Sequence, residues 1–298
     1  MNWSTAKNLI IVSLLLLNIL LLSILQLNSM RYVLTVDRVN NITQVLQNNN
    51  ISLNTTLSYS TAIRRFFGSS EAMFAPKYSI KMVHADDILR DASQYFFLSH
   101  ENIKLISNYD HITYTNGSES LVIRNSSFQY QNARGTGFMI LSSDVAYSFA
   151  NAYISQLHEI FETFVHNATF VYDDHILVDF RGMYRDHMLY SNVLRIRVTD
   201  RGITEVYGSF YKPIQFYEHS QSICAPDEAL LIFMTEIRNI YDSTEHISIT
   251  KIDLVHYKDT IQGGQLETIR AVPHYRIYID GLNNPFLINA FSNTMIHI

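Results

Sequence analysis

The sequence predicts an α+β protein, with helices packed on antiparallel sheets, that follows one N-terminal transmembrane helix. Three observations lead to this prediction. An uncharged apolar segment follows Lys7. In the rest of the chain, helices of period 3.6 alternate with short strands of period 2. Tyr (19) and Phe (17) are abundant while Gly (10) and Pro (5) are scarce, which favours ordered, aromatic-rich sheet over low-complexity sequence.

The apolar segment has the length and composition of a membrane span. No charged residue occurs from Asn8 to Met30, and 15 of the 19 residues in Leu9–Leu27 are Leu, Ile or Val. As a helix these residues span about 28 Å, close to the hydrocarbon thickness of a bilayer. The alternative is a cleaved signal peptide, which has a shorter apolar stretch and a small-x-small cleavage site that is absent here. We therefore expect a retained anchor over residues 8–27.

The charges beside the anchor predict its orientation. Lys7 and the N-terminal amine lie on the short side, and the positive-inside rule places that side in the cytoplasm. Residues 1–7 are then a cytoplasmic tail, and nearly everything after Met30 lies outside the cell. The chain is expected to be a single-pass protein of the cell membrane.

Outside the membrane we expect two similar α+β lobes, residues 32–134 and 138–298, separated by the polar stretch Asn132–Gly137. The first lobe is expected to begin with a strand over Tyr32–Thr35 and a helix that Asp37 caps, with Val39, Ile42, Val45 and Leu46 facing the core. The other elements expected in it are a strand over Ile51–Leu57, a short helix from Ser60 that carries Ile63, Phe66 and Phe67, and strands at Tyr78–Val83, Ile103–Ile106, Leu121–Arg124 and Ser127–Gln131.

The second lobe has the clearer pattern. Apolar residues at helical spacing predict a long helix that Ser143 or Asp144 caps, with Val145, Phe149, Tyr153, Leu157, Phe161 and Phe164 on one face. Pro226, followed by Asp227 and Glu228, predicts the start of a second helix. Strands are expected at Thr169–Tyr172, Ile176–Phe180, Leu194–Thr199, Ile203–Phe210, Ile247–Tyr257, Arg270–Asp280 and Phe286–Phe291, with a hairpin turn at Asp200-Arg201-Gly202.

Charge and chemistry exclude several classes of function. The net charge of −5 argues against nucleic-acid binding, and the single cysteine, Cys224, excludes an intramolecular disulfide. His158 and Glu162 share a helical spacing but lack the second histidine of a zinc-protease helix, and Asp173-Asp174-His175 is typical of a polar turn. We therefore expect no catalytic residues, no cofactor and no metal site.

The N-terminus and several internal stretches together resemble one bacterial family. Met1-Asn2-Trp3-Ser4-Thr5-Ala6-Lys7, running straight into the anchor, resembles the start of the YycI (WalI) family, in which Asp stands where this chain has Asn2. The resemblance extends over most of the chain but is weak over residues 70–135. The further stretches that carry it are Asp37–Leu53, Arg195–Gly208, Lys212-Pro213-Ile214, Pro226–Phe233, Val272–Tyr278 and Ile288-Asn289-Ala290-Phe291.

The resemblance implies an accessory regulator. Members of this family act with a YycH-like partner and modulate the essential sensor histidine kinase YycG (WalK) of cell-wall homeostasis in Gram-positive bacteria, with contacts attributed largely to transmembrane helices. Trp3, Ser4 and Lys7 are then candidate interaction residues. Asn18 is a fourth, because an amide at mid-membrane is easier to place when a partner helix hydrogen-bonds it; the alternative is a lone amide that faces lipid. The rival function is a membrane-anchored envelope enzyme, or an inhibitor of a cell-wall enzyme.

Overall fold

The computed structural model describes most of the chain. The described residues are 3–30, 34–55, 57, 77–98, 102–136, 142–157, 161–259 and 268–296. Within them the protein is a mixed α+β structure with a large, mostly antiparallel sheet and one apolar N-terminal helix, as the sequence predicts. The short helix expected from Ser60, with Ile63, Phe66 and Phe67, falls outside the described residues.

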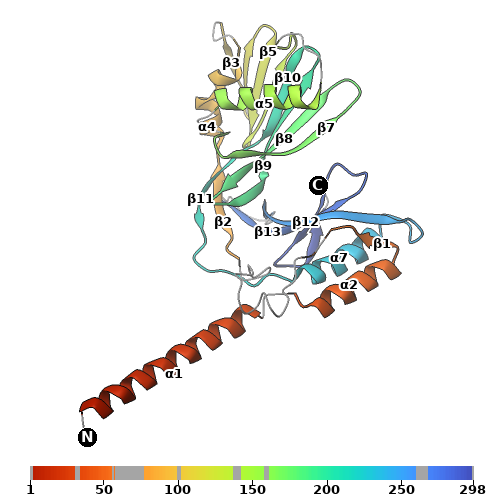
Figure 1. The fold of residues 1–298 in the computed structure, drawn as a ribbon. Helices are drawn as coiled ribbons and strands as arrows, with labels where there is room; N and C mark the ends of the chain where they lie inside the picture. Colours follow the sequence, from red (N-terminus) through yellow and green to blue (C-terminus); the bar gives the residue numbers. More distant parts are fainter. Residues whose placement is uncertain are drawn as a thin grey trace. The chain divides into compact units, whose positions relative to one another are not determined.

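Helix α1 runs without a break from Trp3 to Met30 (Figure 1). Its segment Lys7–Ile24 is long and apolar enough to cross a membrane, and none of that segment is buried against the rest of the protein. The helix begins four residues before Lys7, so the expected tail of residues 1–7 is largely helical.

The chain divides into two compact units that interleave along the sequence. Unit 1 contains α1, the segment up to Lys77, residues 220–253 and residues 275–298, and unit 2 contains residues 78–219 and 254–274. The boundary expected at Asn132–Gly137 does not follow this division. Strand β6 (Ser127–Asn132), which precedes it, pairs with β10 (Gly202–Ser209), which follows it.

In unit 1 two helices accompany a small sheet. Helices α2 (Val36–Asn48) and α7 (Pro226–Ile237) pack together. Strand β1 (Ile51–Leu53) pairs in parallel with the start of β12 (Ile247–Lys258), while β14 (Phe286–Asn289) pairs antiparallel with β15 (Thr294–Ile296). The apolar residues Ile42, Leu46, Leu230, Phe233 and Ile237 on the two helices are all buried.

The two helices of unit 1 begin as their sequences dictate, with one difference. Pro226 is the first residue of α7, as predicted, and the Glu228 carboxylate accepts a hydrogen bond from the Ala225 backbone N–H. Helix α2 is capped by Thr35, whose hydroxyl accepts from the Arg38 backbone N–H, and not by Asp37. Leu34 and Thr35 therefore do not continue a strand, because Thr35 is already committed to the helix end.

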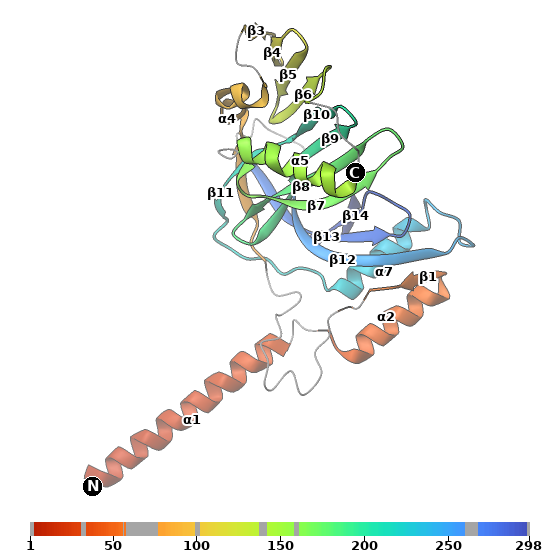
Figure 2. The same ribbon diagram turned by 45° about the horizontal axis from the view of Figure 1, so that its top comes forward.

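Unit 2 is built on eight antiparallel strands in the order β7-β8-β9-β10-β6-β5-β4-β3. Figures 1 and 2 show them as one row, with β3 at its end. Besides β6 and β10, the sheet contains β3 (Lys104–Ser107), β4 (Ile112–Asn116), β5 (Glu119–Arg124), β7 (Phe164–Val171), β8 (Ile176–Tyr184) and β9 (His187–Thr199).

Shorter elements complete unit 2. They are β2 (Ile80–His84), α4 (Asp86–Asp91), the 3-10 helix η1 (Ser93–Phe96), α5 (Ser143–Gln156), β11 (Tyr211–Phe216) and the first half of β13 (Thr268–Ile279). Strand β2 lies between β11 and β13 and pairs antiparallel with both.

Helix α5 covers one face of the eight strands, crossing β8, β9 and β10 (Figure 2). The core beneath it is rich in aromatic rings, with Phe96, Tyr130 and Phe161 fully buried. Leu194, Ile196 and Val198 of β9 face this core, which confirms the predicted alternation of that strand. The opposite face of the sheet carries the polar members of the same strands.

The predicted second-lobe helix is too long. Helix α5 ends at Gln156, its cap is Ser142 and not Ser143 or Asp144, and Phe164 belongs to β7. Phe161 and Phe164 nevertheless join the same core as Tyr153 and Leu157. The apolar period thus continues past the end of the helix because Phe161, which precedes β7, and Phe164, its first residue, are buried in the same core.

Candidate functional site

The four predicted interaction residues lie along one face of α1. Successive residues of an α-helix are about 100° apart around its axis. Lys7 and Asn18 are eleven residues apart, which brings them within about 20° of each other. The positions of Trp3 and Ser4 lie on either side of Asn18, within about 60° of it. The four positions therefore lie within about 100° around the helix axis, with Asn18 about 16 Å further along the axis than Lys7.

Asn18 is a polar residue within the apolar segment Lys7–Ile24 of α1. It is exposed, and its neighbours Leu17 and Ile19 are exposed apolar residues. Ser23 differs from it, because the Ser23 hydroxyl donates to the Ile19 carbonyl oxygen at 2.8 Å and is satisfied within its own helix. The amide of Asn18 forms no such bond within the described part of α1. In hydrocarbon an amide without a partner is costly.

Trp3 and Lys7 lie in the first two turns of α1. Trp3 is 83% exposed, and Lys7 is exposed one turn further along. An aromatic ring and a cation at a helix end are typical of the membrane–water interface. Treating residues 1–7 as a tail hid their alignment with Asn18, since the alignment exists only if the helix starts at Trp3.

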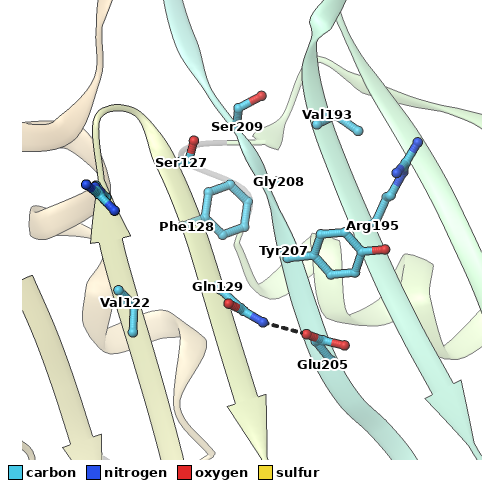
Figure 3. A pocket seen from close by; sticks show the side chains of 11 residues that line it. Val122, Ser127, Phe128, Gln129, Val193, Arg195, Glu205, Tyr207, Gly208 and Ser209 are labelled. Atoms are coloured by element: carbon cyan, nitrogen blue, oxygen red, sulfur yellow. Dashed lines mark hydrogen bonds between the residues drawn. The ribbon is translucent and has the colours of Figure 1, made fainter. Parts of the chain in front are cut away.

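Unit 2 offers a second candidate, a shallow hollow of about 780 Å³ on the open face of its sheet (Figure 3). A row of directly paired residues crosses it from β5 to β9: Val122, Gln129, Tyr207 and Arg195. Glu205 lies beside the row and accepts a hydrogen bond from the Gln129 amide at 2.7 Å. The hollow thus presents guanidinium, carboxylate, amide and phenol groups on a flat floor.

A buried carboxylate fixes one wall of this hollow. Asp179 of β8 is fully buried and accepts hydrogen bonds from Arg181 Nε (2.9 Å) and Arg195 Nε (2.9 Å). Asn167 donates to the same carboxylate at 2.8 Å. Burial alone would lower the pKa of Arg195, but the hydrogen bond and charge of Asp179 outweigh it and raise that pKa. Arg195 is therefore a fixed cation at the edge of the hollow.

Among the described residues weighed for catalysis, Cys224 and His175 lie in unrelated surroundings. Cys224 is buried, and desolvation together with the negative charge of Glu228 raises the pKa of its thiol to about 12. The thiol is therefore protonated at neutral pH, and the helix start beside it does not activate it. His175 interacts with Asp174 at 2.6 Å in an exposed turn, as expected for Asp173-Asp174-His175. His158 lies outside the described residues, among which no three His, Cys, Asp or Glu side chains are placed to hold a metal.

Comparisons with known proteins identify the fold and no family. No protein-family model and no curated protein sequence match the chain. Its structure is similar to that of an uncharacterised protein from Eubacterium rectale, with 14% identity, a TM-score of 0.51, and coverage of 83% of this chain and 90% of that one.

Two further solved structures are similar to this chain. They are the C-terminal domain of Bacillus megaterium YpeB (12% identity, TM-score 0.42, 72% and 97% coverage) and YycH from Bacillus subtilis (12%, 0.43, 73% and 55%). At 14% identity the likeness to the Eubacterium rectale protein concerns the α+β fold alone.

Proposed function

We propose that this chain is a membrane-anchored accessory regulator of a sensor histidine kinase of cell-wall homeostasis, acting together with a YycH-like partner. The observation that carries the proposal is the shared face of Trp3, Ser4, Lys7 and Asn18 on the continuous helix α1. The sequence resemblance to the YycI family supports it, since three of these residues belong to the motif by which the resemblance is noticed.

In this proposal α1 spans the membrane with its N-terminus in the cytoplasm, and units 1 and 2 lie outside. Lys7 on the short side supports this orientation. Helices in a bilayer associate through close packing and interhelical hydrogen bonds. Helix α1 is dominated by Leu and has no Gly-x-x-x-Gly motif, so close backbone approach is not available to it. Asn18 supplies the directional contact to the transmembrane helices of the kinase and of the YycH-like partner.

The test uses one variant that removes the Asn18 amide and one that moves it to another face of α1 while keeping the amino-acid composition of the helix. Asn18→Leu removes it, and the double variant Asn18→Leu/Leu20→Asn places it about 200° around the helix, on the other face. Association with the kinase is measured by cross-linking in membranes at equal expression. We expect both variants to lose association to a similar extent, because both lack an amide at position 18. The expected loss is about 0.6–2 kcal/mol, the contribution of an interhelical amide hydrogen bond. Full association of the double variant would refute a contact on this face.

The open-face hollow favours a second candidate function, inhibition of a cell-wall enzyme. Its polar floor and the fixed Arg195 suit recognition of a polar surface. If the chain acts this way, adding it to a wall hydrolase slows the digestion of purified cell walls, and Tyr207→Ala relieves the inhibition. An unchanged digestion rate with the parent chain excludes this function.

A further inference from the structure

Strand β3 ends the eight-stranded sheet of unit 2 with an exposed, apolar edge. Among the described strands it pairs only with β4, and all four of its residues are exposed. Leu105 is 60% exposed and Ile106 is 50% exposed. Tyr109, in the turn that follows, is fully exposed. Apolar side chains and unpaired backbone groups therefore occur together at this edge.

The hairpin fixes which backbone groups face outward. The Asn108 N–H donates to the His111 carbonyl oxygen at 3.0 Å, so residues 108 and 111 form a hydrogen-bonded pair. Such pairs alternate with non-hydrogen-bonded pairs along an antiparallel ladder. Residues 106 and 104 are then bonded to β4, and the N–H and C=O groups of Leu105 and Ser107 point away from the sheet. This edge can accept another strand without breaking any existing bond.

The opposite edge of the same sheet is protected, and β3 is not. Strand β7 carries a bulge between His166 and Ala168, and the side chain of the intervening Asn167 is bound to Asp179. Bulges, charges and prolines are the usual devices that keep edge strands from pairing. Strand β3 pairs with β4 in unbroken register and contains no proline, and its one charge is Lys104.

We propose that β3 pairs antiparallel with β3 of a second copy of this chain, about a two-fold axis at Leu105. The outward N–H and C=O of Leu105 then bond to those of the same residue in the second copy. This pairing is self-complementary, as a two-fold interface requires. It continues both sheets into one and gives each exposed Leu105 an apolar cross-strand neighbour.

Side-chain charges fit this register. Leu105 lies opposite Tyr114, which lies opposite the buried Leu121, so Leu105 is on the helix-covered side of the sheet. When Leu105 pairs with Leu105 of the second copy, Lys104 pairs with Ile106 of the second copy, and these two side chains lie on the opposite face of the sheet. No two like charges stand opposite each other, and the Lys104 stem covers apolar surface.

The strand is short, so the pair is expected to be weak in dilute solution. An interface of a few strand residues falls below the size of stable complexes. If α1 anchors both copies in one membrane, as proposed above, confinement raises their effective concentration. The pairing then forms between membrane-anchored copies at expression levels at which chains diluted in detergent separate.

The experiment uses the full chain in lipid vesicles, with pairing measured by energy transfer between donor- and acceptor-labelled copies. All chains carry Asn18→Leu to remove the amide of the anchor. We expect the chain with native Leu105 to pair. Leu105→Lys and Leu105→Glu chains, each alone, should pair on the order of tenfold more weakly, because like charges then stand opposite each other. A mixture of the two should regain pairing, which also shows that both variants fold.

The matched control is Val165→Lys on β7, an exposed apolar residue at the other edge of the sheet, which should leave pairing unchanged. Equal energy transfer in the Leu105→Lys chain and its parent would overturn the proposal, as would a mixture that stays unpaired. Absence of transfer in the parent at high protein-to-lipid ratio would also overturn it. None of these outcomes depends on a kinase, so failure here is distinct from failure of the proposed function.

Discussion

Arg38 and Asp227, which are 189 residues apart in the sequence, form a two-point ion pair between α2 and α7. Arg38 Nε lies 2.7 Å from Asp227 Oδ2, and Arg38 Nη2 lies 2.8 Å from Oδ1. The pair joins the first turns of the two helices, where the Asp227 carboxylate also meets the positive end of the α7 dipole. The segment that follows α1 is thereby fastened to the C-terminal part of unit 1.

Replacing Arg38 should loosen this connection. Arg38→Lys keeps the charge but loses the planar fork, so we expect both Arg38→Lys and Arg38→Ala to destabilise unit 1. Because Arg38 is 39% exposed, solvent screening limits the loss to about 1 kcal/mol. Urea unfolding of the full chain in detergent measures it. Arg90→Ala, which removes an exposed pair with Asp87 at 3.7 Å, is the control and should change stability little.

Asp179 should be far less tolerant of substitution. Asp179→Ala leaves Arg181, which is buried, and Arg195 without their shared carboxylate. Removing one partner of a buried ion pair costs about 3–5 kcal/mol, mostly because the remaining charge is uncompensated. The midpoint of urea unfolding should fall accordingly, while Asp174→Ala, at a carboxylate that is 71% exposed, should barely move it. Similar midpoints for the two variants would contradict this account.

Gly208 should resist even the smallest side chain. A Cβ on Gly208 would meet the Val193 carbonyl oxygen at 1.9 Å, and backbone atoms on both strands would have to move. We expect Gly208→Ala to destabilise unit 2 by about 1–3 kcal/mol, as overpacking does. Gly117→Ala is the control, since its Cβ meets open space and only its positive φ of 58° opposes the change. Thermal unfolding followed by circular dichroism compares the two, and a larger loss at Gly117 would argue against close strand contact at Gly208.

The features that the sequence predicted well are local ones. The alternation of Leu194, Ile196 and Val198 is visible within one strand, and so is the turn before Gly202, whose φ of 86° needs glycine. Pro226 likewise predicts the start of α7, because proline is favoured at the first position of a helix. Each of these features depends on residues a few positions apart, so it can be predicted without knowing how distant segments pair.

The features that were missed depend on distant parts of the chain. The pairing of β6 with β10 removes the expected boundary, and no local signal links these two segments. Asp179, Arg181 and Arg195 sit on two strands whose register decides that they meet. The candidate interaction residues of α1 can be read from the sequence, but their positions around the helix axis follow from where the helix begins. The sequence predicts a strand near Leu105 but not that this strand ends the sheet. The exposure of Leu105 depends on that position in the strand order.

The ion pair between Asp253 and Arg276 predicts a pH dependence of stability in unit 1. Arg276 is almost fully buried and donates to both carboxylate oxygens of Asp253, at 2.7 and 2.6 Å. Burial alone would raise the pKa of Asp253, but the hydrogen bonds and charge of Arg276 outweigh it and hold that pKa below 3.8. A carboxyl whose pKa is lower in the folded state binds protons less readily there than in the unfolded chain. Its contribution to the free energy of unfolding is therefore complete above the unfolded pKa and disappears as the pH falls through the folded pKa.

Comparison of the parent with Asp253→Asn isolates this contribution from that of the other carboxylates. At pH 7 we expect the variant to be less stable by about 2 kcal/mol, because the buried Arg276 loses its charge-assisted hydrogen bonds to the Asp253 carboxylate. As the pH falls below the unfolded pKa towards the lower folded pKa of Asp253, the parent loses this contribution, so the two unfolding free energies should approach each other. Urea unfolding of both full chains at a series of pH values from 7 down to 2.5 measures the difference. A difference that stays constant over this range would mean that the Asp253 carboxylate does not carry the stabilisation.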